Sequence, residues 1–491
     1  MADTFPHYSN KTTGENIMKK TTVSLNNLIT TGDGIFKGWG TSMCWWANRV
    51  GGSEKLIKDA ADLFFDKEKG LGLNIMRYNI GGGDDPTHTH IQRTDSMMPG
   101  FLEKDKITGE LKWNYEADKR QLDVLEACYK ASGEDAYVEA FSNSPPYFMC
   151  VSGCSSGHRN PLCNNLRKDC VEDFAEYLAH VTVYIQREKN IKISSLAPMN
   201  EPYTNYWYMN SPKQEGCHVS PGKRQSELLV AVKKAMRKYN LDSTDLTASD
   251  ETNADRAAKA FSALSPDALS IIDRVSTHTY ERATPKIGKL CRRTGIDLWM
   301  TETDWSSESG ENAGEMGPAL WLSEKIIEDM YVLRPSAWVI WQIVASYISK
   351  DGYLGRKDMP SMFDLGKGYW GCAVAEMDSE EYLLTQKYYA FGQFSRYIRP
   401  GMRIILTDRK SLCAYDEDRL VIVAVNTKKS DEEAEFTLEN LPAFSSVKAI
   451  RTSGDMNTGE HWADVSCHTL SENSLTATLK GNSITTFILT K

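Results

Sequence analysis

Apolar and polar residues follow two different periods along the first part of the chain. Eight short apolar runs have the length and composition of buried strands: Phe36–Thr41, Leu73–Ile80, Tyr137–Ser142, Ser195–Met199, Leu246–Ser249, Arg274–His278, Leu298–Thr301 and Trp338–Val344. Longer amphipathic segments separate them. In Cys170–Arg187, for example, the apolar residues from Val171 to Ile185 fall at steps of three or four, which is typical of a helix with one buried face. The pattern therefore predicts strands that alternate with helices.

Strands that alternate with helices indicate βαβ units and a parallel sheet. Eight such units favour a closed (β/α)8 TIM barrel over an open doubly wound sheet, and we assign the barrel to residues 35–397. An open sheet usually carries a glycine-rich nucleotide loop after its first strand. Here the first run contains Gly38-Trp39-Gly40 and is followed by the bulky pair Trp45-Trp46, which is unlike that loop.

The pattern changes after Pro400. Short β-type runs separated by Asp, Asn, Ser and Gly follow one another, which predicts an antiparallel β-sandwich over residues 398–491. Thr21–Leu28 also alternates, so we expect residues 18–34 to add an N-terminal strand to that sandwich, with residues 1–17 as a tail. The sandwich is interpreted as a structural support, with sugar binding as the alternative.

Composition and charge narrow the range of partners. The 491 residues contain 57 Lys and Arg against 66 Asp and Glu, a net charge of −9, without a basic run. A chain of this kind is a poor partner for nucleic acid or for an anionic membrane. It also lacks an apolar run of about 18 residues, so no membrane span is expected. The first 20 residues do not resemble a signal peptide, which leaves a cytoplasmic protein or one secreted with its signal removed. The sequence does not indicate an oligomeric state.

Candidate chemistry lies at the strand ends, because barrel enzymes act at the carboxyl ends of their strands. Glu201 follows the fourth run in Asn200-Glu201-Pro202, and Glu302 follows the seventh. Two carboxyl groups that face each other about 5–5.5 Å apart are the apparatus of a retaining glycosidase, one as acid/base and one as nucleophile. A single glutamate at a strand end is more often a salt-bridge partner, so the pair carries the argument.

The other strand ends supply groups suited to a sugar. Aromatic rings stack on the apolar faces of sugars, and Asn, His and Arg side chains bind hydroxyl groups. Arg77 ends the second run and is the natural cation to keep a nucleophile ionised. An internal ion pair of Arg77 with Asp84, Asp85 or another acid at the rim is the alternative.

Several of these segments together resemble one enzyme family. GWGTSMCWWA, MRYNIGGGD, FSNSPPYFM, LAPMNEP, STHTY and LWMTETDW occur in this order and are similar to glycoside hydrolase family 30, most of all to its endo-β-1,6-galactanase branch. The resemblance implies a retaining β-glycosidase with Glu201 as acid/base and Glu302 as nucleophile, without a cofactor or a metal. It further implies that Asn200 binds the sugar 2-hydroxyl, that Arg77 supports the nucleophile and that His278 and Tyr280 border the reacting ring. The remaining implied substrate-binding residues are Trp46, Asn143, Tyr203, Trp305 and Trp341.

Other interpretations stay open at this stage. β-1,6-Glucanase, β-glucosidase, β-xylosidase and β-fucosidase would use the same two acids on another oligosaccharide or polysaccharide, and a non-catalytic carbohydrate-binding protein would need neither. His88-Thr89-His90 with Asp84 and Asp85 nearby would suit a metal-dependent barrel hydrolase.

A cysteine-rich segment is a separate question. Cys150, Cys154, Cys163 and Cys170 lie in one segment with His158, and they could bind zinc, form disulfides or remain thiols. Their spacing fits no pair of CxxC motifs.

Overall fold

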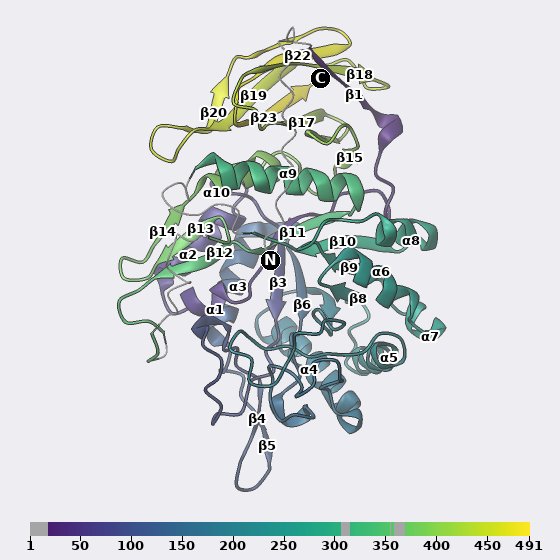
Figure 1. Ribbon diagram of the computed structural model, residues 1–491, viewed down its shortest axis with the longest axis vertical. Coiled ribbons are helices and arrows are strands. Elements are labelled where there is room, and N and C mark those ends of the chain that lie inside the picture. The colour runs from purple at the N-terminus through teal and green to yellow at the C-terminus, as the bar shows by residue number, and fades with distance from the viewer. Residues whose placement is uncertain (1–17, 306–314, 354, 358–368) are drawn as a thin grey trace.

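The computed structural model describes residues 18–305, 315–353, 355–357 and 369–491, and the predicted tail 1–17 lies outside them. Eight parallel strands form a closed barrel in chain order (Figure 1). They are β2 (Gly38–Ser42), β3 (Ile75–Asn79), β6 (Tyr137–Phe141), β7 (Ile193–Ala197), β8 (Asp245–Glu251), β9 (Arg274–His278), β10 (Asp297–Glu302) and β11 (Ala337–Gln342). The predicted TIM barrel is confirmed.

Helices surround the barrel. They are α1 (Trp46–Val50), α2 (Glu54–Ala60), α3 (Lys119–Ser132), α4 (Val171–Glu188), α5 (Lys223–Lys238), α6 (Ala254–Ser262), α7 (Pro266–Leu269), α8 (Lys286–Thr294), α9 (Met316–Val332) and α10 (Gln386–Ser395). The predicted apolar face of α4 is buried, from Phe174 to Ile185. Helix α2 begins after Ser53, whose hydroxyl accepts a hydrogen bond from the backbone N–H of Leu56 and so caps the helix. None of the described helices combines the length and apolar composition needed to cross a bilayer.

Two sheets beyond the barrel enclose a second core. One has the order β1 (Lys19–Ser24), β18 (Glu432–Glu439), β22 (Ser474–Leu479) and β21 (His468–Leu470). The other has the order β15 (Arg403–Ile405), β16 (Ser411–Tyr415), β17 (Arg419–Asn426), β23 (Ser483–Thr490), β19 (Ser446–Ser453) and β20 (Glu460–Val465). Buried side chains of both sheets, such as Phe436 and Phe487, pack together, as in a sandwich.

The N-terminal strand joins this sandwich with one difference from the prediction. β1 does pair with β18, but the two strands run parallel, with Lys19 opposite Ala434 and Ser24 opposite Glu439. The sandwich packs on the outer helices α9 and α10 (Figure 1). There Trp462 of β20 donates a hydrogen bond from its indole N–H to the carbonyl of Tyr389 at 2.7 Å. The predicted domain limits, 35–397 and 398–491, stay a prediction.

Two further sheets lie in the loops at the carboxyl ends of the barrel strands. The hairpin of β4 (Leu102–Lys104) and β5 (Leu111–Trp113) belongs to the long loop after β3 and projects from the barrel (Figure 1). After β11, β12 (Val344–Ile348), β13 (Ala373–Glu376) and β14 (Glu381–Leu384) form a three-stranded sheet. The loops after β3 and β11 therefore carry structure of their own beside the strand ends.

Candidate active site

Glu201 and Glu302 meet inside the carboxyl end of the barrel. Glu302 is the last residue of β10, and Glu201 lies four residues beyond β7; both are buried. His278, at the end of β9, lies between them, with its Nδ1 atom 3.1 Å from an oxygen of Glu201 and 3.5 Å from an oxygen of Glu302. One oxygen of each glutamate lies within 4.8 Å of the other. The two carboxyl groups therefore face a common space at a separation that suits retention.

Arg77 binds Glu302 from the interior of the barrel. Its Nη1 atom donates to Glu302 Oε2 at 3.0 Å, its Nη2 atom to Asp250 Oδ2 at 2.6 Å and its Nε atom to Glu139 Oε1 at 2.9 Å. The guanidinium is fully buried. Of the alternative partners, Asp84 and Asp85 do not pair with Arg77, but Asp250, another acid near the end of a barrel strand, does. A buried cation with three carboxylates is charge-compensated, and one of those carboxylates is the candidate nucleophile.

The charges around His278 make it a cation. Burial alone would lower its pKa, but the negative charges of Glu302 and Asp250 outweigh burial and raise the pKa of His278 to about 10. As an imidazolium it donates through Nδ1 to Glu201 and through Nε2 to Asp250, each at 3.1 Å. Asp250 also accepts from Arg77, and although burial opposes them, these two cations hold the pKa of Asp250 well below its usual range.

The two glutamates differ in their remaining contacts. Tyr280 donates its hydroxyl to Glu302 at 2.8 Å, so Glu302 receives hydrogen bonds from Arg77 and Tyr280. Burial raises the pKa of Glu302 to about 7 against the opposing effect of His278 and Arg77, and the charge of Glu201 adds to the rise. Glu201 accepts from the hydroxyl of Tyr206 on its other oxygen. Each of the two carboxyl groups is thus held by two hydrogen-bond donors.

The backbone at Glu201 is fixed in an uncommon conformation. Its φ is 46°, in the left-handed region that non-glycine residues seldom adopt. Its N–H donates to the carbonyl of Asp250 at 2.8 Å, and its carbonyl accepts from the indole N–H of Trp207 at 3.0 Å. A strained backbone conformation of this kind persists only where surrounding contacts enforce it, and such conformations are common at functional sites.

Comparison with known proteins identifies the family. The sequence model of O-glycosyl hydrolase family 30 matches residues 22–354. The chain belongs to glycoside hydrolase family 30. It is 27% identical over 420 residues to the endo-β-1,6-galactanase of Hypocrea rufa, covering 80% of this chain and 79% of that one. It is 25% identical to the exo-β-1,6-galactobiohydrolase of Bifidobacterium longum, over 71% of this chain and 29% of that protein.

Solved structures agree in fold. The catalytic domain of the family 30 xylanase C from Talaromyces cellulolyticus superposes with a TM-score of 0.73 at 16% identity, covering 96% of this chain and all of that one. A conserved exported protein from Bacteroides fragilis gives 0.74 at 17% identity, with the same coverage. At these identities the likeness shows the fold alone. The family makes this chain a glycosidase that acts on carbohydrate.

Aromatic side chains line one side of this glycosidase site. Trp341 at the end of β11 packs edge to face on Trp45, with ring centroids 5.1 Å apart, and Tyr280 packs against Trp370 at 5.8 Å. Trp305, which follows β10, is 53% exposed. These rings are of the type that contacts sugar faces.

Two of the predicted substrate-binding residues lie elsewhere. Trp46 is fully buried in the barrel core, where its indole N–H donates to the carbonyl of Ser42 at 2.8 Å and its ring packs on Phe64. Trp46 is the first residue of α1, all of whose residues are buried. Its neighbour Trp45 packs on Trp341 instead. Tyr203 turns outward to α6, where Lys259 donates to its hydroxyl at 2.5 Å.

The two predicted asparagines are buried at the site with free acceptor atoms. Among the described residues, the side-chain oxygens of Asn143 and Asn200 have no hydrogen-bond partner, although both are buried. A buried polar atom without a partner is costly, so it is suited to a ligand hydroxyl.

Tyr206, Asp250 and Glu139 were missed by sequence reasoning. Asp250 had a signal, because Asp250-Glu251 ends the fifth strand as Glu302 ends the seventh. Tyr206 lies within a loop and Glu139 within strand β6, where nothing in the local sequence marks either residue.

The donor set at this centre is unsuited to a metal ion. Glu201, His278 and Glu302 are close enough to share one. However, His278 is a cation that donates through both ring nitrogens, and a ligating imidazole must be neutral with a free lone pair. Arg77 adds a second positive charge at the same place. The arrangement favours proton transfer and nucleophilic attack.

Proposed function

We propose that this chain cleaves β-1,6-linked galactan or galacto-oligosaccharides with retention of configuration, by double displacement. The observation that carries this proposal is the pair of buried carboxyls whose oxygens lie within 4.8 Å of each other across His278. The galactan linkage is supported by the two curated relatives, both of which are named for β-1,6-galactose chemistry. A non-catalytic binding protein would have no use for the paired acids.

The contacts assign different roles to the two glutamates. Arg77 and Tyr280 donate hydrogen bonds to Glu302 and stabilise negative charge on it, so we assign Glu302 as the nucleophile and Glu201 as the acid that donates the proton. A Glu302 oxygen attacks the anomeric carbon while Glu201 gives its proton to the leaving glycosidic oxygen. Water then gives a proton to Glu201, its oxygen bonds to the anomeric carbon, and Glu302 leaves as a carboxylate.

The surrounding residues suit the sugar that reacts. The free side-chain oxygens of Asn200 and Asn143 would accept hydrogen bonds from its hydroxyl groups. Trp341, Trp45 and the more exposed Trp305 would contact the sugar rings. Arg77 and Tyr280 act through Glu302, and Tyr206 and His278 through Glu201.

Substrate choice is tested with oligosaccharides that differ in one hydroxyl configuration. We expect β-1,6-galacto-oligosaccharides to be cleaved at least about 100-fold more efficiently than matched β-1,6-gluco-oligosaccharides, because a site that hydrogen-bonds one hydroxyl rejects its epimer. Proton NMR during the reaction should show the β-anomer of the new reducing end first. Preference for the gluco series would assign a β-1,6-glucanase, and an α-anomer formed first would contradict double displacement.

A basic limb in the pH profile follows from the proton that the acid must donate. Because burial, with the charge of Glu201 adding to its effect, raises the pKa of Glu302 to about 7, the catalytic centre loses a proton as the pH rises through that value. We expect kcat/KM to fall tenfold per pH unit well above 7. In Glu201→Gln, assayed on an aryl β-1,6-galactobioside with a good leaving group, this limb should disappear, because the proton no longer has to be retained. A basic limb that is unchanged in Glu201→Gln would contradict the assignment of Glu201 as the acid.

A further inference from the structure

Four side chains that can bind a metal ion converge outside the catalytic centre. Asp84, His88 and His90 belong to the loop after β3, and Cys154 belongs to the loop after β6. One ligand atom from each of the four lies within 4.8 Å of all the others. In the sequence these residues lie in two unrelated motifs, the His88-Thr89-His90 pair and the cysteine-rich segment. Only the fold brings both histidines of the first motif together with one cysteine of the second.

Four of the separations between these ligand atoms, 3.1–4.0 Å, lie near those of a tetrahedral zinc site. Asp84 Oδ2 lies 3.1 Å from His88 Nδ1, 3.6 Å from His90 Nε2 and 4.0 Å from Cys154 Sγ. His90 Nε2 lies 3.6 Å from Cys154 Sγ. Zn–N bonds of about 2.0–2.1 Å and Zn–S bonds of about 2.3 Å at tetrahedral angles separate the ligand atoms by about 3.3–3.6 Å. A hydrogen bond between Asp84 and His88 accounts for the contact of 3.1 Å. It does not account for the approach of His88, His90 and Cys154 to the same oxygen of Asp84.

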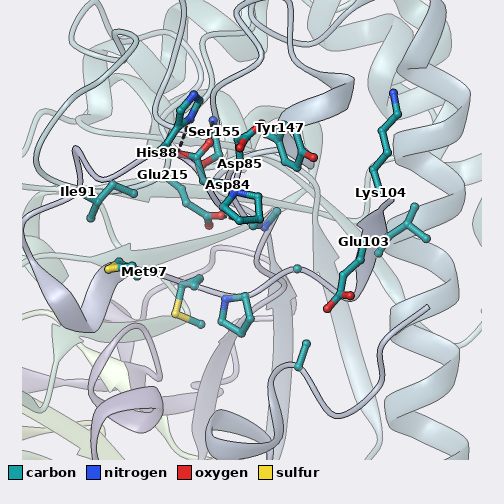
Figure 2. Close-up of a pocket in the computed structure, with 18 of the residues that line it drawn as sticks. Asp84, Asp85, His88, Ile91, Met97, Glu103, Lys104, Tyr147, Ser155 and Glu215 are labelled. Atoms are coloured by element: carbon teal, nitrogen blue, oxygen red, sulfur yellow. Dashed lines mark hydrogen bonds and ion pairs between the residues drawn. The ribbon is translucent and has the colours of Figure 1, made fainter. Parts of the chain in front are cut away.

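The surroundings orient these ligands. The second oxygen of Asp84 accepts a hydrogen bond from the backbone N–H of Ser155 at 3.0 Å, which leaves Oδ2 directed at the cluster. Cys154 is fully buried, and the side chains of Asp84 and His90 are 15% and 12% exposed. Asp84 and His88 lie together on one wall of a cavity of about 430 Å³, next to Ser155 (Figure 2). Fixed, enclosed ligands supported by a second layer of hydrogen bonds are typical of metal sites.

We propose that Asp84, His88, His90 and Cys154 bind one structural zinc ion. A thiolate with two imidazoles selects zinc over magnesium and calcium, which prefer oxygen ligands. Four protein ligands complete the tetrahedron and leave no open position for water, so the ion is structural rather than catalytic. The proposal departs from the sequence-based expectation that no metal is bound, and it is independent of the proposed substrate.

The ion would connect the loops after β3 and β6 directly, and hydrogen bonds extend this connection to the loop after β7. Immediately after Cys154, His158 exchanges backbone hydrogen bonds with the loop after β7, accepting from Met209 at 3.0 Å and donating to Trp207 at 3.3 Å. That loop carries Tyr206, which contacts Glu201. A zinc ion between the loops after β3 and β6 would therefore brace the segment that places Tyr206.

Metal content tests this proposal directly. The full chain is produced in zinc-supplemented medium, purified without chelator and analysed by inductively coupled plasma mass spectrometry. We expect about one zinc per chain in the wild type and less than about a tenth in Cys154→Ser and in His90→Ala. Cys163→Ser is the matched control, because Cys163 belongs to the same segment but is exposed and outside the cluster; it should keep the zinc.

Cobalt spectroscopy keeps the test decisive if a variant does not fold. Wild-type protein stripped with chelator and titrated with Co²⁺ should show tetrahedral d–d bands and a thiolate-to-cobalt charge-transfer band, saturating at about one ion per chain. Removal of zinc should also lower the Tm, since an ion bound only by the native state stabilises it. A wild type without zinc and without the charge-transfer band would overturn the proposal, as would zinc retained in folded Cys154→Ser.

Discussion

Replacing Glu302 by Gln should reduce kcat on β-1,6-galactan by at least about 10⁴-fold, because the amide cannot form the covalent intermediate on which both steps depend. Gln keeps nearly the same shape, and its one side-chain oxygen can still accept a hydrogen bond from Arg77 or from Tyr280, which contact different oxygens of Glu302 in the native site. The variant should therefore fold. Steady-state kinetics on the polymer measures the loss of kcat, and circular dichroism measures whether the variant is folded.

The matched control for this substitution is Glu281→Gln. Glu281 follows Tyr280 in the same loop but is exposed, so the same loss of one negative charge should leave kcat within about twofold of wild type. A Glu302→Gln protein that is folded and retains activity within tenfold of wild type would remove Glu302 from the mechanism.

Replacing Glu201 by Ala should cost about 10²–10⁴-fold on galactan, whose leaving group needs a proton. On an aryl β-1,6-galactobioside with a good leaving group, the first step needs no acid, so the glycosyl-enzyme on Glu302 should accumulate. Added azide should then restore turnover, because this small anion can enter the space left by the carboxyl and needs no general base.

The configuration of the azide product separates the two roles. Attack on a glycosyl-enzyme at Glu302 gives the β-glycosyl azide, with net retention. If Glu201 were instead the nucleophile, azide would attack the substrate directly and give the α-azide. NMR of the product distinguishes these outcomes, and an absence of rescue would count against the acid/base role of Glu201.

The features predicted from sequence are those that local pattern determines. Each strand and the helix after it are specified by their own apolar spacing, as in Cys170–Arg187, so the barrel follows from repetition of one unit. Glu201 and Glu302 could be identified because a parallel barrel brings all its strand ends to one rim. The same rule places His278 at that rim, whereas Arg77 is the third residue of β3 and reaches Glu302 from the interior of the barrel.

The features that were missed depend on the conformation of loops and on contacts between distant segments. Trp45 and Trp46 are adjacent, chemically identical and both buried, but only Trp45 packs on Trp341, whereas Trp46, the first residue of α1, packs on Phe64. Tyr206 reaches Glu201 only through the course of the loop after β7. Cys154 of one loop contacts His90 of another, although the two residues are 64 positions apart in the sequence. The spacing of residues along the chain carries no signal for contacts of this kind.

The central claim is that Glu302 bonds covalently to the anomeric carbon of the sugar. In a β-1,6-galactobiosyl fluoride that carries a second fluorine at the 2-position of the reacting ring, this second fluorine slows both formation and breakdown of the intermediate. The fluoride leaving group speeds formation alone, so the intermediate accumulates. Mass spectrometry of the inactivated protein should show one added galactobiosyl group, and peptide mapping should place it on Glu302. An added group on any other residue, or complete turnover of this reagent to an inverted product, would contradict the account.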